Sequence, residues 1–96
     1  MSSVLSDLVA HYPAIINKMP AQFTAHQFIQ SLTQQYQALY IEALYHYKDS
    51  AEPFTVVHGQ IGSHLHDFKE LVKNIGTAES VNIFGAINIV SLWEKL

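Results

Sequence analysis

The chain contains neither cysteine nor arginine. The missing cysteine excludes a disulfide framework, a thiolate metal site and a thiol nucleophile. Five lysines are the only Lys or Arg residues, and the formal net charge is −3 with the six histidines neutral. A protein that neutralises many DNA phosphates usually carries a basic surface, because counterion release drives that binding. Strong non-specific DNA binding is therefore not expected of this chain alone.

Long apolar runs and enzyme motifs are missing as well. No apolar stretch approaches the ~18 residues of a membrane helix. The first residues, MSSVLSDLVAHYP, include Asp7 and no basic region, unlike a secretory signal. We therefore expect a cytoplasmic protein without a membrane partner. The chain has no GxSxG, P-loop or Rossmann fingerprint, so we expect neither an enzyme nor a bound cofactor.

Apolar residues make up 49% of the 96 residues and charged residues only 14%. This length predicts a single domain over residues 1–96. The charged fraction is well below the ~25% usual for globular domains. We therefore expect some apolar surface to be covered by a partner, such as a second copy of the chain.

The first twenty residues have an amphipathic helical pattern. Ser2 or Ser3 is placed to cap a helix that begins there. Pro13 interrupts the pattern, so either the helix kinks or a second helix begins at this proline. Apolar side chains recur at steps of three and four at Leu5, Leu8, Tyr12, Ile15 or Ile16, and Met19.

Thr24 and Gln27 match a capping box and predict the start of a long helix over about residues 25–48. Its broad apolar stripe indicates burial on more than one side. Aromatic rings with a polar tip suit a half-buried protein interface. We therefore expect a dimer interface formed by Tyr36, Tyr40, Tyr45 and Tyr47.

The polar segment 48–53 ends in a proline and predicts a turn. Thr55 is the expected cap of the next helix, whose apolar side chains are Val57, Ile61, Leu65 and Phe68. Two readings of the following residues stay open. The helix runs on to Gly76, or it ends near Phe68 and residues 71–75 form a strand.

From Ser80 onward, β-branched and aromatic residues predict a C-terminal β-hairpin. Its expected strands are Val81–Phe84 and Val90–Lys95, joined through Gly85–Ile89. A third short strand near Gln22 and Phe23 would complete the sheet. The expected fold is thus α+β, with two or three helices followed by the hairpin. The expected core comprises Leu8, Ile15, Phe28, Leu32, Leu39, Leu44, Val57, Ile61, Leu65, Phe68, Ile83 and Trp93.

Over residues 23–96, the order of helix, turn, helix and hairpin resembles a winged helix-turn-helix domain. The resemblance implies a small DNA-binding transcription regulator that acts as a dimer. The helix after the turn would then face the major groove and the hairpin would touch the backbone, with contacts from Thr55, His58, Gln60, Ser63, His64, Lys69, Asn82 and Asn88. The alternative is a protein-interaction module on the same scaffold without nucleic acid, which the acidic charge and the absence of arginine favour.

The stretch Gly59-Gln60-Ile61-Gly62 resembles the GxxG loop of KH domains, which lets a nucleic-acid backbone approach closely. The reading we favour is instead tight packing of this helix against the preceding long helix. The pairs Glu42 with His46 and His66 with Glu70 have the i, i+4 spacing of metal ligands. Two ligands do not make a site, so no metal is expected.

Overall fold

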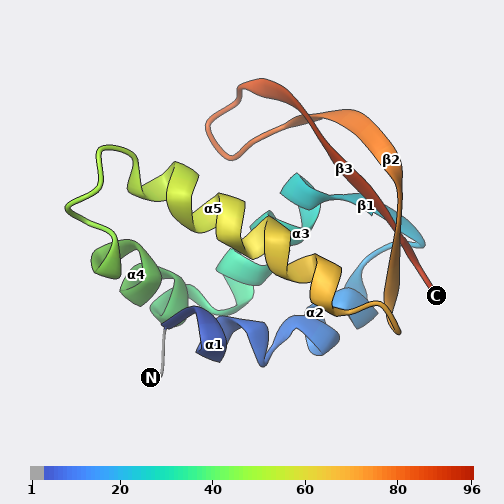
Figure 1. Ribbon diagram of the computed structural model, residues 1–96, viewed down its shortest axis with the longest axis horizontal. Coiled ribbons are helices and arrows are strands. Elements are labelled where there is room, and N and C mark those ends of the chain that lie inside the picture. The colour runs from blue at the N-terminus through green and yellow to red at the C-terminus, as the bar shows by residue number, and fades with distance from the viewer. Residues whose placement is uncertain (1–3) are drawn as a thin grey trace.

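A computed structural model describes residues 4–96, and Ser2 and Ser3, the expected helix caps, lie outside this range. The fold is α+β, with five α-helices and a three-stranded antiparallel sheet in the described residues. The helices are α1 (Val4–Val9), α2 (Tyr12–Lys18), α3 (Ala25–Gln35), α4 (Gln37–His46) and α5 (Pro53–His64). The strands are β1 (Gln22–Thr24), β2 (Val72–Val81) and β3 (Ile87–Lys95). The β2–β3 hairpin arches over α3 and α5, and α1 and α2 lie on the other side of α5 (Figure 1).

The first helical pattern divides at Pro13, as one of the two sequence readings predicts. Pro13 lies in the first turn of α2, where a proline loses no helical hydrogen bond. The buried Tyr12 hydroxyl donates to the Ile61 carbonyl oxygen at 2.6 Å, which ties α2 to α5. Burial, and to a lesser degree the charge of Asp67, raises the pKa of Tyr12, so this hydroxyl remains a donor at physiological pH.

Thr24 caps α3 in a capping box with Gln27, as the sequence predicts. The single helix predicted over residues 25–48 is wrong, because the chain breaks at Tyr36 (φ −127°, ψ 57°). The Tyr36 ring stacks on His11 with 4.0 Å between ring centroids. After the break, α4 packs against both α1 and α5.

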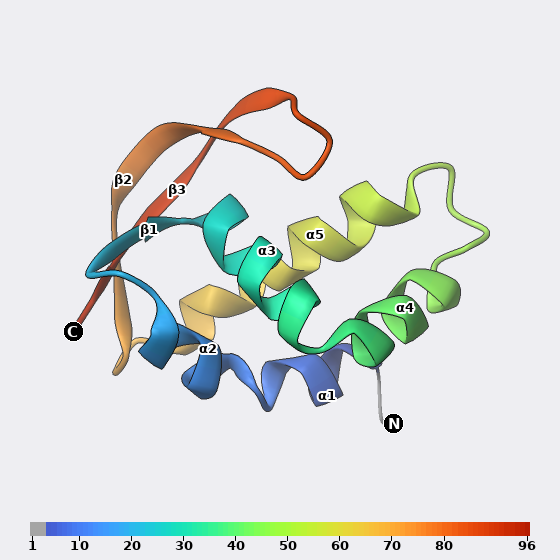
Figure 2. The same cartoon turned by 180° about the vertical axis from the view of Figure 1, so that it is seen from behind.

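Helix α5 begins at Pro53 with Glu52 as its N-cap, so the expected cap at Thr55 is wrong. The helix ends at His64, and a 3₁₀ turn (Leu65–Asp67) follows. The reading in which the helix ends and a strand follows is confirmed, but Leu71 lies in a turn and the strand runs from Val72 to Val81, beyond the expected residues 71–75. Behind the hairpin, β1 leads directly into α3 (Figure 2).

The sheet has the order β1-β3-β2, so the predicted hairpin describes only part of it. The third strand expected near Gln22 forms as β1 and pairs with Leu92–Glu94. The predicted hairpin boundaries are wrong, because Ile83 and Phe84 lie in the turn. The Asn82 side-chain oxygen accepts the N–H groups of Phe84 and Ala86, and Gly85 takes a φ of 84°, which L side chains rarely adopt.

Most of the expected core is buried, including Phe28, Ile61 and Trp93. Leu39, Leu44 and Phe68 are partly buried and pack against this core. Ile83 is exposed to 43%, so its expected core position is wrong. No helix in residues 4–96 is long and apolar enough to span a membrane.

Candidate binding cleft

A cleft of about 550 Å³ lies between α5, the start of α3 and the β2–β3 hairpin. Positions three and four residues apart share one face of a helix, and the cleft is lined by Thr55, His58, Gly59, Gly62 and Ser63 of α5 and by His66 of the following 3₁₀ turn. The opposite wall includes four consecutive β3 residues, Asn88–Ser91. Side chains alternate between the two faces of a strand. A wall of consecutive residues therefore means that the cleft borders the edge of β3.

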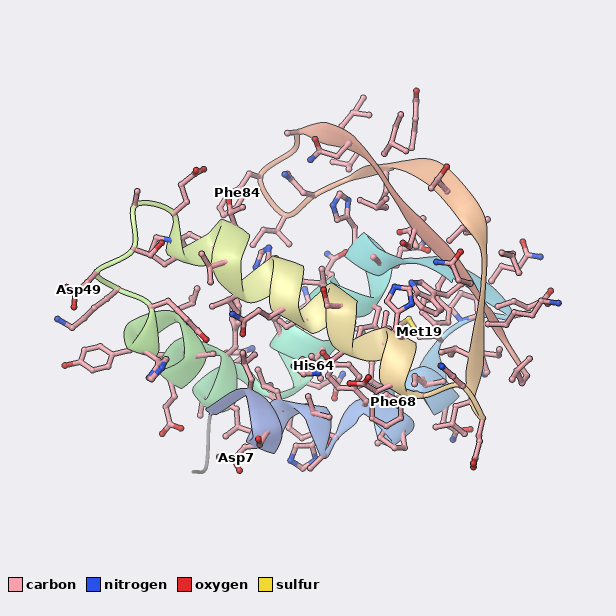
Figure 3. All side chains as sticks on the ribbon, in the orientation of Figure 1. Asp7, Met19, Asp49, His64, Phe68 and Phe84 are labelled. Atoms are coloured by element: carbon pink, nitrogen blue, oxygen red, sulfur yellow. The ribbon has the colours of Figure 1, made fainter. Side chains whose placement is uncertain are left out.

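Aromatic rings close the end of the cleft near the hairpin turn. Phe84 contacts Phe54 edge to face, with 5.0 Å between ring centroids, and it stacks over His58 at 6.5 Å. Figure 3 shows Phe84 above the first turns of α5. The hairpin end is thereby held against the helix, although Phe84 itself remains 62% exposed.

His58 is the central titratable group of the cleft. Its Nε2 atom lies 2.5 Å from the Tyr40 hydroxyl oxygen. Burial of the imidazole, reinforced by the nearby His26, lowers the pKa of His58. Burial raises the pKa of Tyr40. Both shifts favour the neutral side chains, so the Tyr40 O–H can donate to His58 Nε2.

The described lining of the cleft contains polar groups but no carboxylate or ammonium group. Its described lining contains no Asp, Glu or Lys, and histidine is its only titratable residue type. The Nδ1 atom of His26 is buried without a hydrogen-bond partner in the described structure. Within residues 4–96, no three His, Asp or Glu side chains gather closely enough to hold a metal ion. The lining therefore suits an uncharged ligand with hydrogen-bonding groups.

The two α5 glycines open the cleft and do not serve helix packing. A Cβ atom added at Gly59 or Gly62 would meet no atom of another element within 4 Å, so the predicted tight packing against the preceding helix is wrong. Both glycines lie inside a regular helix, and the resemblance to a KH-type GxxG loop is therefore not realised. Glycine weakens a helix by roughly 1 kcal/mol relative to alanine. The two glycines that leave space in the cleft therefore also lower the stability of α5.

The residues predicted to contact DNA do not share one surface. Some of them meet on the cleft lining, namely Thr55, His58, Ser63, Asn82 and Asn88. Gln60 and His64 face α1 and α4 on the other side of α5, where Gln60 accepts the Tyr47 hydroxyl and His64 lies 3.1 Å from Asp67. Figure 3 shows His64 on the side of α5 away from the hairpin. Lys69 lines a separate hollow beside Trp93.

The tyrosines predicted to form a dimer interface mostly contact their own chain. Tyr36 stacks on His11, Tyr40 bonds to His58, and Tyr47 donates to Gln60. Tyr45 is 69% exposed and lies near the Lys48 ammonium group. Of these four side chains, Tyr45 is therefore the most accessible to another molecule.

Sequence reasoning missed Phe54, Phe84 and His26 as parts of the cleft. Phe54 directly follows Pro53, and His26 lies two residues after the helix cap Thr24. Neither position indicates which surface the side chain will line. Phe84 lies in the segment Asn-Ile-Phe-Gly, whose Asn and Gly are turn residues. That signal could have placed Phe84 at an exposed hairpin turn.

Comparison with known proteins finds no match: no family model, no curated protein and no solved structure is significantly similar to this chain.

Proposed function

We propose that this chain is a protein-interaction domain on a winged-helix scaffold, and that the cleft and the adjoining hairpin end form its binding surface. The order of elements supports the scaffold. Helix α5 follows a turn, the hairpin follows α5, and the short strand β1 lies beside β3 in the order β1-β3-β2. A helix flanked by a hairpin in this way is the arrangement that winged-helix proteins use for recognition.

The observation that carries the proposal is the apolar, uncharged character of the hairpin end. Large apolar side chains are exposed there at Val81, Ile83, Phe84, Ile87 and Ile89. They adjoin a cleft whose described lining has no lysine. Clustered exposed apolar groups with aromatic rings mark protein interfaces, whereas a DNA-binding face needs cations. The surface therefore suits a protein partner better than a phosphate backbone.

Site-specific photo-crosslinking in the native cell tests this function. A benzophenone amino acid replaces Ile87 at the hairpin end in one variant and Ala14, an exposed α2 residue, in a matched control. We expect position 87 to yield a discrete protein adduct that position 14 does not. Identical adducts from both positions, or none from position 87, would contradict the proposal.

A second candidate function is sequence-specific binding of duplex DNA. Thr55 and Ser63 on the α5 wall of the cleft and Asn88 on the opposite β3 wall favour it, because such side chains can contact phosphates and base edges. In this candidate the hairpin would have to move away from α5 before a groove could approach these residues. A dimer would supply the affinity that the lysine-poor surface lacks.

A further inference from the structure

The edge of β3 that borders the cleft has unpaired backbone groups. Strand β1 pairs only with Leu92–Glu94, because Thr24 caps α3 and the chain then turns away. On its other side, β3 pairs with β2 as far as Ile87. Residues 87–91 therefore have a sheet neighbour on one side only.

Two hydrogen bonds identify which residues direct their backbone toward the free side. The Lys95 N–H donates to the Ala21 carbonyl at 2.9 Å, on the β1 side. The Asn82 N–H donates to the Ala86 carbonyl at 2.8 Å, on the β2 side. Backbone groups of a strand alternate between its two sides, and the register irregularity of the hairpin lies in β2 and not in β3. The backbone groups of Ile87, Ile89 and Ser91 therefore point to the β1 side, where β1 no longer reaches.

This edge lacks the protection that the other edge of the sheet carries. Strand β2 has Lys73 and Glu79 and a register shift between Asn74 and Gly76, and charges and bulges both discourage pairing with another strand. The β3 stretch Ile87-Asn88-Ile89-Val90-Ser91 has no charge and no bulge. Ile87 and Ile89 are 66% and 72% exposed. The β3 edge is thus the side of the sheet that remains available to a further strand.

We infer that an extended, uncharged peptide segment of the partner protein adds to the β3 edge as a further strand and lies in the cleft above α5. This inference rests on the proposed function and specifies how the partner is bound. Backbone pairing with Ile87, Ile89 and Ser91 supplies affinity, as in other cases of strand addition. About five peptide residues match this edge, at ~3.4 Å per residue.

The cleft selects the chemistry of that segment. The described lining offers no counter-charge, so a charged peptide side chain would lose its hydration without compensation. The missing side chains of Gly59 and Gly62 leave open space beneath the added strand. At the hairpin end, Phe54 and Phe84 provide an aromatic contact for an apolar peptide side chain. The buried His26 Nδ1 offers a hydrogen bond that no described group of this chain satisfies.

A display library of random nine-residue peptides, selected against the purified full chain, supplies the probes. We expect uncharged, β-prone peptides to be selected. Amide hydrogen exchange measured by NMR should then slow at least tenfold at Ile87, Ile89 and Ser91 when the peptide binds. Asn88 and Val90 already face β2, so their exchange should change less. This alternation distinguishes strand pairing from general coverage of the surface.

Two proline variants on the same rung of the hairpin provide the matched control. Ile89 and Glu79 are cross-strand partners whose N–H groups point to opposite free edges. A proline on a free edge removes one N–H without breaking the β2–β3 ladder. Ile89→Pro should lower peptide affinity at least tenfold, and Glu79→Pro should leave it unchanged. If either variant fails to fold, the exchange pattern of the wild-type chain decides alone.

The other outcomes separate this inference from the proposed function. Failure to select any binding peptide would overturn strand addition. Selected peptides that bind without the alternating protection would also overturn it, but a specific crosslink at position 87 would still support a protein-interaction domain. Alternating protection without peptide, rising with protein concentration, would show that a second copy and not a partner protein occupies the edge.

Discussion

His58 lies where α4, α5 and the hairpin meet, through contacts with Tyr40, Phe54 and Phe84. Burial and the neighbouring His26 lower its pKa in the folded chain, whereas an unfolded histidine titrates near ~6.5. Below that pH, the unfolded chain binds a proton that the folded chain does not. The contribution of neutral His58 to stability is therefore complete above about pH 6.5 and is lost as the pH falls through the lowered pKa.

Substitution of His58 should accordingly flatten the pH dependence of stability. We expect the free energy of unfolding of the wild-type chain to fall more between pH 7.5 and pH 5 than that of His58→Gln. Urea denaturation at the two pH values measures this difference. His46, an exposed histidine of α4, provides the control, because His46→Gln should retain the wild-type dependence. An identical pH dependence in His58→Gln and the wild-type chain would contradict the burial of a neutral imidazole.

At the scale of single elements, α5 is less stable than its length allows because of Gly59 and Gly62. Neither glycine packs against a neighbour, so Gly59→Ala and Gly62→Ala should each raise the free energy of unfolding by about 1 kcal/mol. Gly85→Ala is the contrasting variant. Gly85 has a φ of 84°, so Gly85→Ala should lower the free energy of unfolding by about 1–2 kcal/mol. Urea denaturation of the three variants tests this account, and a loss of stability in Gly59→Ala would instead indicate tight helix packing.

Local chemistry made several elements predictable. The Thr24 capping box and the interruption of the first helical pattern at Pro13 follow from side chains that act on their nearest neighbours. The break at Tyr36 was not predictable in this way. It depends on the ring of His11, which is distant in sequence, and on the packing of α4 against α1 and α5.

The hairpin shows how apolar content can mislead. Ile83 and Phe84 were predicted to lie in a strand because they are β-prone and apolar, yet Asn82 and Gly85 form a turn around them. The position of the hairpin is also the reason why the candidate site was not predicted. Spacing on α5 indicated a polar face with His58 and Ser63, but the cleft exists only because the hairpin folds back over that face. Long-range strand pairing determines where the hairpin lies, and residue spacing within one helix gives no information about it.

At the scale of the whole molecule, charge separates the two candidate functions. The described cleft has no lysine, Lys69 lies in another hollow, and the Lys95 ammonium group donates to the Asn17 and Met19 carbonyls. The net charge of −3 adds a weak general repulsion of DNA. Apolar groups are instead concentrated at the hairpin end. The distribution of charge and apolar groups therefore supports our proposal of a protein partner over that of a phosphate backbone.

The most direct test of this claim is a fluorescence-anisotropy titration of the purified chain with random duplex DNA at about 50 mM and about 200 mM salt. Phosphate contacts weaken steeply with salt, and a protein that makes several of them loses roughly 10³-fold or more in affinity over this range. We expect no binding at either concentration. Binding at the lower salt that disappears at the higher salt would establish phosphate contact and contradict the assignment of the cleft and hairpin end to a protein partner.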